Sequence, residues 1–327
     1  MVTTSRYVEN VTSIQFDQFN TLILLLHGYG EYSERYRTFM DSFFEHQQLF
    51  CNNKSVAFYS YDMRGHGYSS GHGKYFWRSS DEHVYDLDRI IRDRVPFILD
   101  QVLKSPNAQI VLIAHSIGAL NLLSYLDFNK TVVEGNFTGS TMTPKTRITS
   151  LERSQITFSG LILTSPCLIL RGYSIEEMIS SNLNSLFAIE RYLVKLIEPL
   201  FPSLPVHPSF GVLCSNPTCM KQYKYDKMIY KGPWIASTFV ALTEQFKTVL
   251  TNMLNVTQSQ NITIDRSILV MAGQDDKIFD WQQTKHLLEN HFGRVDFRTY
   301  DGVKHDLLHE VHNPQILQDT IKYICVN

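Results

Sequence analysis

The sequence predicts an α/β protein with a mostly parallel central β-sheet, helices on both faces of the sheet and an inserted helical cap. The main observation is that short apolar runs alternate along the chain with longer helical patterns, which is typical of parallel strands joined by crossover helices. A second observation is that residues 171–255 interrupt this alternation with helical patterns of their own. Because ligands bind at the carboxyl ends of strands in such sheets, we expect the functional residues there.

Six apolar runs are the predicted strands. They are Thr21–Leu26, Val56–Tyr61, Ile110–Ile113, Leu161–Thr164, Ile268–Ala272 and Val295–Tyr300. Apolar residues at helical spacing predict helices over Tyr36–Phe44, Val84–Leu103 and Trp234–Leu254 and directly after Ser116. Right-handed crossovers between the strands follow from this arrangement.

Two segments depart from the alternation. Lys130–Phe158 is rich in Thr, Ser and Gly with little periodicity, so we expect a long, mobile surface loop. Residues 171–255 combine helical apolar patterns with a proline-rich stretch, and their first part lies where a cap over an active-site mouth would be inserted. The expected domains are a core of residues 1–170 and 231–327 and a cap of residues 171–230.

Composition excludes several classes of protein. The chain has 327 residues, of which 43% are hydrophobic and 19% charged, which is typical of a globular protein with a sizeable core. A net charge of −2 offers no basic face to nucleic acid. No run reaches the ~18 apolar residues of a membrane span, and the polar segment Met1–Asn20 has no apolar core of signal-peptide length.

The five cysteines are scattered along the chain. An odd number without the spacing of metal ligands predicts reduced thiols and a cytoplasmic protein. Cys214 and Cys219 lie close together and could pair, but free thiols are the favoured interpretation.

One serine lies at a predicted strand-to-helix turn. The apolar run Ile110–Ile113 leads to Ser116, and a helical pattern follows. Such a turn lifts the serine Oγ out of the sheet and places it at a helix N-terminus, where backbone N–H groups face developing negative charge. The residues two before and two after the serine must be small, since strand and helix nearly touch there, and they are Ala114 and Gly118. We therefore predict that Ser116 is a nucleophile.

A serine nucleophile needs a base, and the base needs an acid that orients it. In this kind of fold the acid follows a late strand and the histidine follows the last one. His305 follows the last predicted strand and is the expected base, and Asp275 or Asp276 follows the strand before it. Asp301 competes as the acid, but it is too near His305 in sequence to brace it easily from the other side.

Backbone donors must stabilise the oxyanion of acyl transfer. The N–H of Ile117 follows the nucleophile, and the N–H of Tyr29 lies in the motif His27-Gly28-Tyr29-Gly30, which ends an early strand. No phosphate-binding glycine loop and no metal-ligand cluster occurs, so we predict no cofactor and no metal. His66 and His72 lie near Asp62, but the turn at His66 is interpreted as structural. His309 and His312 are expected to fall in the following helix and to point elsewhere.

Together, five segments resemble the monoacylglycerol lipase and lysophospholipase family of the α/β-hydrolase superfamily. They are residues 27–36 (HGYGEYSERY), 62–69 (DMRGHGYS), 115–118 (HSIG), 273–276 (GQDD) and 300–305 (YDGVKH). In that family the acid lies three residues after the glycine, which selects Asp276 over Asp275. Tyr225-Asp226-Lys227-Met228 also resembles the family's return from cap to core. The chain departs from the family in Ala114, which replaces the first elbow glycine, in a short segment before His27 and in a longer 130–158 loop.

The resemblance implies a serine hydrolase that cleaves carboxylic esters of single-chain lipids through an acyl-enzyme, above all monoacylglycerol to glycerol and fatty acid. The alternatives are a broad-specificity carboxylesterase, a lysophospholipase or an acyltransferase with the same triad, and a non-catalytic binding protein with the hydrolase fold. Haloalkane or epoxide chemistry would need a carboxylate where Ser116 stands.

The family's cap carries an apolar lip that touches membranes to collect lipid. We therefore expect the helices of Ile175–Ile197 to expose an apolar lip, with Leu183, Leu186, Phe187 and Leu193 as candidate members. The expected partners are a lipid ester substrate and, through the cap, the surface of membranes or lipid droplets.

Overall fold

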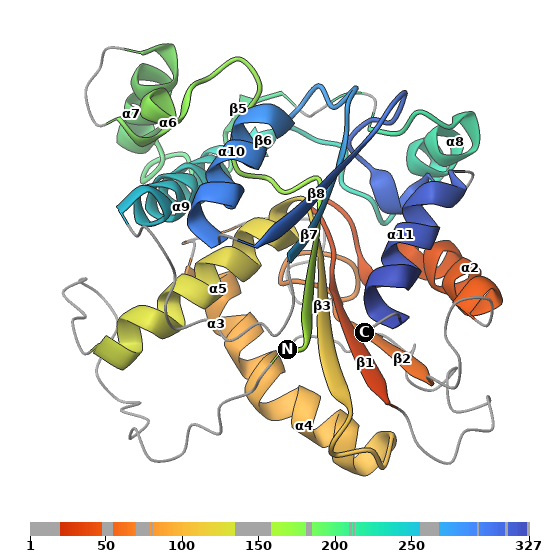
Figure 1. Ribbon diagram of the computed structural model, residues 1–327. Coiled ribbons are helices and arrows are strands. Elements are labelled where there is room, and N and C mark those ends of the chain that lie inside the picture. Colours follow the sequence, from red (N-terminus) through yellow and green to blue (C-terminus); the bar gives the residue numbers. More distant parts are fainter. Residues whose placement is uncertain are drawn as a thin grey trace.

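The computed structural model describes residues 20–47, 55–69, 77, 79, 81–134, 158–180, 185–208, 211, 213–255, 268–292, 294–310 and 313–325, without the side chains of 127–134. Within this part of the chain, six parallel strands form one sheet in the order β2-β1-β3-β4-β7-β8 (Figure 1). The strands are β1 (Thr21–Leu26), β2 (Val56–Ser60), β3 (Gln109–His115), β4 (Gly160–Thr164), β7 (Ile268–Gly273) and β8 (Val295–Tyr300). Each predicted apolar run is a strand, so the predicted parallel sheet is confirmed.

The two faces of the sheet carry separate apolar clusters, because successive strand residues point to opposite faces. In β1, Leu22, Leu24 and Leu26 belong to one cluster, whereas Ile23 and Leu25 belong to the other. The first cluster is covered by α3 (Asp81–Arg89), α5 (Ile117–Glu134), α9 (Ala236–Asn255) and α10 (Trp281–Phe292), and the second by α2 (Arg37–Gln47) and α11 (Pro314–Cys325). Helices therefore cover both faces, as predicted.

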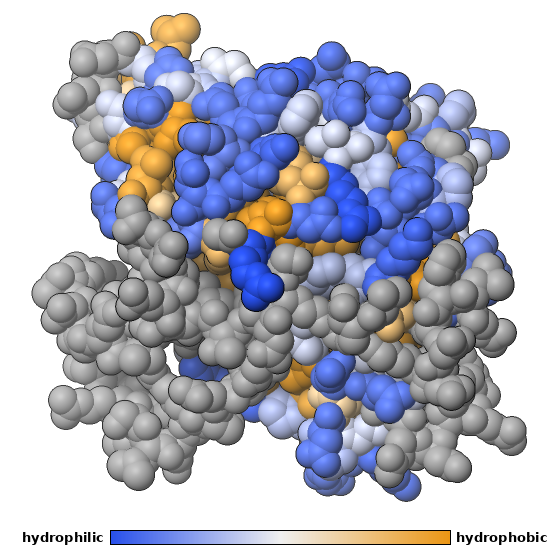
Figure 2. All heavy atoms as spheres, in the orientation of Figure 1, coloured by the Kyte–Doolittle hydropathy of each residue, from blue (hydrophilic) through white to orange (hydrophobic). Residues whose placement is uncertain are grey.

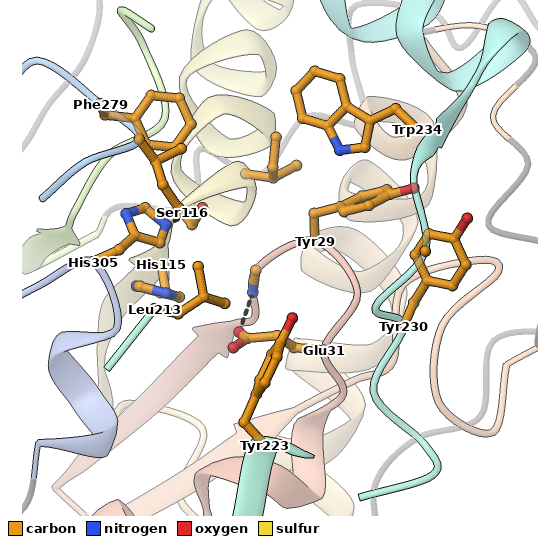
Figure 3. Close-up of a pocket in the computed structure, with 14 residues that line it drawn as sticks. Tyr29, Glu31, His115, Ser116, Leu213, Tyr223, Tyr230, Trp234, Phe279 and His305 are labelled. Atoms are coloured by element: carbon orange, nitrogen blue, oxygen red, sulfur yellow. Dashed lines mark hydrogen bonds between the residues drawn. The ribbon is translucent and has the colours of Figure 1, made fainter. Parts of the chain in front are cut away.

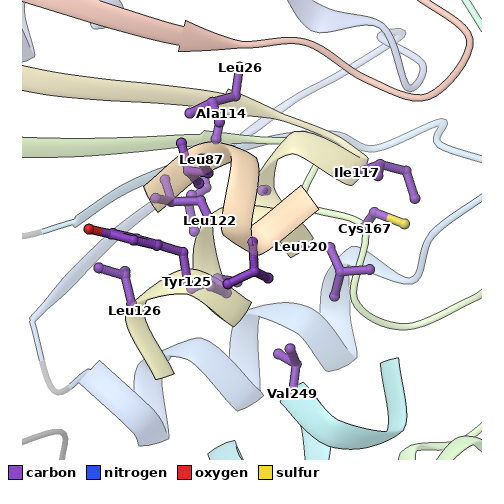
Figure 4. Close-up of a cluster of buried hydrophobic side chains, with 14 of the residues drawn as sticks. Leu26, Leu87, Ala114, Ile117, Leu120, Leu122, Tyr125, Leu126, Cys167 and Val249 are labelled. Carbon is purple, nitrogen blue, oxygen red and sulfur yellow. The ribbon is translucent and has the colours of Figure 1, made fainter. Parts of the chain in front are cut away.

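Helix α5 follows the Ser116 turn and packs deep in the larger cluster. Figure 4 shows Leu120 and Leu122 of α5 among side chains of other elements, including Leu87 of α3 and Val249 of α9. The helix continues to Glu134, so the prediction that a loop begins at Lys130 is wrong for residues 130–134. Between Gly118 in its first turn and Gly135 there is neither glycine nor proline to end the helix. The rest of that predicted loop, residues 135–157, lies outside the described residues.

The predicted helix Val84–Leu103 forms, but its hydrogen bonding changes along its length. It consists of α3, a π-helical stretch η2 (Ile90–Arg94), the short α4 (Val95–Phe97) and a second π-helical stretch η3 (Ile98–Val102). Pro96 lies in α4 and has no N–H to donate, which is one reason for an irregular hydrogen-bond pattern around it. On the other face, α2 is preceded by a single 3-10 turn, η1 (Ser33–Tyr36).

The chain between β4 and β7 lies at the end of the sheet where α5 begins. It contains α6 (Ile175–Ile179), α7 (Leu186–Ile197), β5 (Pro205–His207), α8 (Pro217–Tyr225), β6 (Trp234–Ile235) and α9. In Figure 1, α6 and α7 lie on one side of this end and α8 on the other. Trp234 and Ile235 pair with β5 in a small antiparallel sheet, so the prediction that the helix begins at Trp234 is wrong by two residues.

Two structural findings bear on the predictions from composition. Cys214 and Cys219 form a disulfide with their Cα atoms 6.2 Å apart, so the expectation of free thiols is wrong for this pair. Asn216 caps α8, and the resulting turn brings the two cysteines together. Cys325 is also disulfide-bonded, so the expectation of reduced thiols is wrong there too, whereas Cys167 is a buried free thiol. Among the described residues, no helix is both long and apolar enough to cross a membrane.

Candidate active site

Ser116 occupies a strained turn between β3 and α5. Its φ of 52° lies in the left-handed region, which non-glycine residues rarely adopt. A Cβ atom at Gly118 would come within 2.7 Å of the carbonyl oxygens of Leu26 and His27 at the end of β1. The small residue two positions after Ser116 is therefore required by close approach of the helix to a neighbouring strand.

His305 joins Ser116 to Asp276 in one hydrogen-bonded chain. His305 Nε2 lies 2.8 Å from Ser116 Oγ, and His305 Nδ1 lies 2.8 Å from Asp276 Oδ2. The other oxygen, Asp276 Oδ1, accepts from the backbone N–H groups of Ile278 at 2.8 Å and Phe279 at 3.1 Å. Because an ionised carboxylate only accepts, Nδ1 carries the imidazole proton and Nε2 is left to accept from the serine hydroxyl. All three side chains are buried.

The electrostatics of this chain favour proton transfer to the imidazole. Burial alone would lower the pKa of His305, but the charge and hydrogen bond of Asp276 outweigh it and raise that pKa above 6.5. Burial would likewise raise the pKa of Asp276, yet His305 and the two backbone N–H groups bring it below 3.8. The ring of His115 lies 5.2 Å from that of His305, and burial lowers the pKa of His115 to about 4, so this second imidazole stays neutral.

The competing residues lie elsewhere. Asp275 and Asp301 are both exposed to solvent. His309 lies in the 3-10 turn η4 (Leu307–His309), and its Nδ1 is 2.5 Å from Asp306 Oδ1. His312 lies outside the described residues. Of the residues weighed for base and acid, the structure thus brings His305 and Asp276 to Ser116.

The two backbone positions predicted for an oxyanion, Tyr29 and Ile117, both line the cavity at Ser116. Ile117 is the first residue of α5, and the first N–H groups of a helix have no acceptor within it. Gly28 instead donates its N–H to Glu31 Oε2 at 3.0 Å, the dashed line in Figure 3. This bond fixes the conformation of the loop that carries Tyr29.

A buried ion-pair network that the sequence analysis did not predict lies beside the site. Arg35 pairs with Glu31 and, at 2.5 Å, with Asp306. Asp306 directly follows His305, so the network links the loop of the histidine to the loop after β1. Burial would raise the pKa of Asp306, but the charge of Arg35 outweighs burial and lowers it, which keeps the pair ionised. The one sequence signal for this network was the resemblance of residues 27–36 to a family motif.

Two side-chain groups among the described residues have a spacing that could suit a metal, but neither fits one. In the group of Glu31, Asp306 and His309, Arg35 already pairs with both carboxylates. In the group of Cys214, Cys219 and Asp306, the two sulfurs are bonded to each other.

The Gly65-His66-Gly67 turn has structural contacts in place of metal ligands. Asp62 Oδ1 accepts from the N–H and the hydroxyl of Ser33, and Asp62 Oδ2 accepts from the N–H of Tyr68. His66 is fully buried, and its N–H donates to the carbonyl of Met63 at 2.9 Å. His72 lies outside the described residues.

Ser116 and His305 open onto a cavity with mostly apolar and aromatic walls. Figure 3 shows the rings of Tyr29, Trp234 and Tyr230 on one side of it and Phe279 on the other. The lining residues are Gly28, Tyr29, Glu31, His115, Ser116, Ile117, Leu213, Tyr223, Tyr230, Gly232, Trp234, Ile278, Phe279 and His305. A chain of nucleophile, base and acid at the wall of an apolar cavity can carry out acyl transfer.

Comparisons with known proteins bear on the fold and the family. The structure is similar to that of a monoacylglycerol lipase from Paleococcus ferrophilus, with a TM-score of 0.65, 16% identity and coverage of 100% of this chain and 99% of that one. It is also similar to a soluble variant of the monoglyceride lipase from Saccharomyces cerevisiae, with a TM-score of 0.62, 17% identity and coverage of 94% and 86%. A thermostable carboxyl esterase from Bacillus coagulans has a TM-score of 0.60, 15% identity and coverage of 94% and 90%. At these identities the likeness establishes the α/β-hydrolase fold.

No curated protein matches the chain significantly. The sequence profile of one family, described as "Serine aminopeptidase, S33", matches residues 17–312 and so covers most of the chain. The chain therefore belongs to the serine aminopeptidase S33 family.

Proposed function

We propose that the protein is a serine esterase of single-chain lipids, with monoacylglycerol as its preferred substrate. The observation that carries this proposal is the hydrogen-bonded chain Ser116–His305–Asp276 at the wall of an apolar cavity. Ser116 acts as the nucleophile, His305 as the general base and acid, and Asp276 as the acid that orients the imidazole.

The reaction follows from the positions of these groups. His305 Nε2 accepts the hydroxyl proton as Ser116 Oγ attacks the ester carbonyl carbon. The negative charge that forms on the carbonyl oxygen is stabilised by the N–H groups of Tyr29 and Ile117. His305 then donates the proton to the departing alcohol, which leaves an acyl-enzyme on Ser116. A water molecule, deprotonated by His305, attacks the acyl carbon. The bond from the acyl carbon to Ser116 Oγ then breaks, His305 returns the proton to Oγ, and the fatty acid is released.

The cavity favours an acyl chain over a peptide, although the family's description names an aminopeptidase. A peptide with a free amino terminus brings an ammonium group that needs a carboxylate partner. Among the described lining residues Glu31 is the carboxylate, and it is already paired with Arg35. Aromatic and aliphatic walls such as Trp234 and Phe279 instead suit a hydrocarbon chain. The structurally similar lipases from Paleococcus and Saccharomyces support the same choice.

An apolar ridge along α7 and the turn after it supports a proposed contact with lipid surfaces. Its members are Leu186 (80% exposed), Leu193 (54%), Leu196 (57%), Leu200 (76%) and Phe201 (58%). Figure 2 shows hydrophobic atoms on the surface over α6 and α7. Of the candidate lip residues, Leu186 and Leu193 are exposed, Phe187 is buried at 2%, and Leu183 lies outside the described residues. We propose that residues 171–230 are a cap whose ridge touches membranes or lipid droplets while the cavity takes up a lipid.

A substrate panel tests the proposal. The purified protein is assayed against monoacylglycerols, lysophospholipids, short p-nitrophenyl esters and an amino-acid p-nitroanilide. We expect the highest kcat/KM on a monoacylglycerol and none on the anilide. Preference for short esters would make the protein a broad carboxylesterase, and preference for a lysophospholipid a lysophospholipase. Preference for the anilide, or the absence of any turnover, would contradict the proposal.

A further inference from the structure

A segment outside the sheet holds the loop that carries Tyr29. The loop is residues 28–32, directly after β1, and the segment is residues 226–234, between α8 and the start of α9. We call them the oxyanion loop and the return segment. The two are about two hundred residues apart in sequence and touch at several points, all beside the cavity.

One contact is between backbones. The N–H of Tyr230 donates to the carbonyl of Gly30 at 2.8 Å. Gly30 has a φ of 77°, and a Cβ atom there would lie 2.7 Å from the carbonyl oxygen of Tyr230. Only glycine permits this approach and this conformation together. The rings of Tyr230 and Trp234 then pack edge-on against Tyr29, with centroids 6.0 Å away in each case (Figure 3).

One side-chain hydrogen bond completes the contact. The hydroxyl of Tyr32 donates to Asp226 Oδ2 at 2.8 Å, and Asp226 Oδ1 accepts from the N–H of Met228 at 2.8 Å. Lys231 Nζ in turn donates to the backbone carbonyl of Asp226. Partial burial, and then the bond to Asp226, raise the pKa of Tyr32, so its hydroxyl remains a donor. Asp226 therefore ties one end of the oxyanion loop to a return segment that is itself tied together.

We infer that Asp226 is a positioning residue for the oxyanion. This inference rests on the proposed function, in which Tyr29 N–H is one of the two oxyanion donors. Asp226 holds Tyr32 and the Tyr230 N–H holds Gly30, so the return segment anchors the loop on the C-terminal side of Tyr29. The bond from the Gly28 N–H to Glu31 holds the loop on the other side, and the peptide of Tyr29 lies between these anchors. Asp226 acts through this loop and touches neither the substrate nor the reacting atoms.

A positioning role for Asp226 predicts a specific kinetic signature. The ground-state carbonyl oxygen needs the donors less than the oxyanion does, so a displaced N–H lowers kcat and leaves KM nearly unchanged. Deleting an oxyanion donor costs about 10²–10³ in kcat, and loosening one costs less. A merely structural role for Asp226 would instead lower the fraction of folded enzyme and would leave the affinity of that fraction for a transition-state analogue unchanged.

The test compares changes to the two partners of one hydrogen bond. Tyr32→Phe removes the donor hydroxyl, Asp226→Ala removes the acceptor, and Asp226→Asn keeps an acceptor oxygen. Tyr225→Phe is the matched control, because it removes a hydroxyl from the tyrosine that directly precedes Asp226 and is 66% exposed. For each variant we measure kcat and KM on a monoacylglycerol, the inhibition constant of an alkyl boronic acid and the melting temperature.

We expect kcat to fall about tenfold in Tyr32→Phe and Asp226→Ala with KM within about twofold, and the boronic acid to bind weaker by the same factor as kcat falls. Asp226→Asn should recover most of kcat, Tyr225→Phe should match the wild type, and Tyr32→Phe/Asp226→Ala should lose no more than Asp226→Ala. Unchanged kcat and inhibitor affinity in Tyr32→Phe would overturn the inference, as would a rise in KM alone.

Two further outcomes are separated by design. If Asp226→Ala does not fold, Tyr32→Phe decides, since it keeps the ring and its packing. If the wild type hydrolyses no ester, the proposed function fails. The rate of fluorophosphonate labelling then tests the inference. This rate should be lower in Tyr32→Phe than in Tyr225→Phe, and equal rates would overturn the inference.

Discussion

The region around Ser116 and the region around α7 differ in how far their side chains are buried and paired. The side chains of Ser116, His305 and Asp276 are buried and joined by hydrogen bonds, and the turn at Ser116 is strained. Along α7, by contrast, leucines face solvent, Leu186 being 80% exposed. Reaction geometry needs fixed groups in a water-poor site, whereas collecting a lipid needs apolar surface that is available to another phase.

This contrast separates two kinds of defect. A change around Ser116 should abolish chemistry without affecting lipid contact, and a change on the ridge should do the reverse. The comparison fails if either region affects both properties equally.

The largest effect is expected at the acid. Asp276→Asn removes the charge that orients His305, and loss of the triad acid costs about 10⁴ in kcat. Asp275→Asn is the matched control, since Asp275 is its exposed neighbour and should retain wild-type activity. Steady-state hydrolysis of a p-nitrophenyl ester, with circular dichroism to check folding, measures both. Loss of activity in Asp275→Asn with Asp276→Asn intact would reverse the assignment.

The pH profile sharpens this prediction. His305 must be neutral to accept a proton, and its pKa is raised above 6.5, so kcat/KM should rise with pH along a limb centred above pH 6.5. In Asp276→Asn the burial of His305 is no longer opposed by the carboxylate. The remaining activity should therefore have its limb at lower pH than the wild type, and a limb that stays in place would show that Asp276 does not set this pKa.

A smaller effect is expected on the ridge. Replacing Leu186, Leu193 and Leu196 by Gln keeps helix-forming residues but removes exposed apolar area, so binding to liposomes should weaken about tenfold or more. Phe97→Gln is the control, because Phe97 is a 47% exposed apolar residue on α4, at the far end of the sheet from α7 (Figure 1). Liposome co-sedimentation measures binding, and turnover of a water-soluble ester should stay at the wild-type level. Equal sedimentation of all proteins would leave the ridge without its proposed role.

The sheet and its functional end could be predicted from the sequence because local patterns encode them. A run such as Thr21–Leu26 is apolar because the strand is buried on both faces. Ser116 could be identified from the strand before it, the helix after it and Gly118. The choice between Asp275 and Asp276 came from a family resemblance. In the structure, the choice coincides with the two backbone N–H groups that hold Asp276 Oδ1.

The remaining features depend on contacts that no local pattern contains. Arg35 meets Asp306 across 271 positions, and this pairing follows from the tertiary arrangement alone. The strand at Trp234 is two residues long and is defined by its partner β5, so a helical pattern after it concealed it. The pairing of Cys214 with Cys219 depends on the turn at Asn216, which composition does not indicate. The argument from cysteine count to a reduced setting consequently no longer holds for these residues.

The nucleophile is the central claim, and a fluorophosphonate probe tests it most directly. Such a probe reacts covalently with a serine that a neighbouring base activates, so one stoichiometric label on the wild-type protein identifies the reactive residue by peptide mass spectrometry. We expect the label on Ser116, no label on Ser116→Ala, and the same melting temperature for both proteins. Labelling of Ser116→Ala at the wild-type rate, or a label located on another serine, would contradict the account.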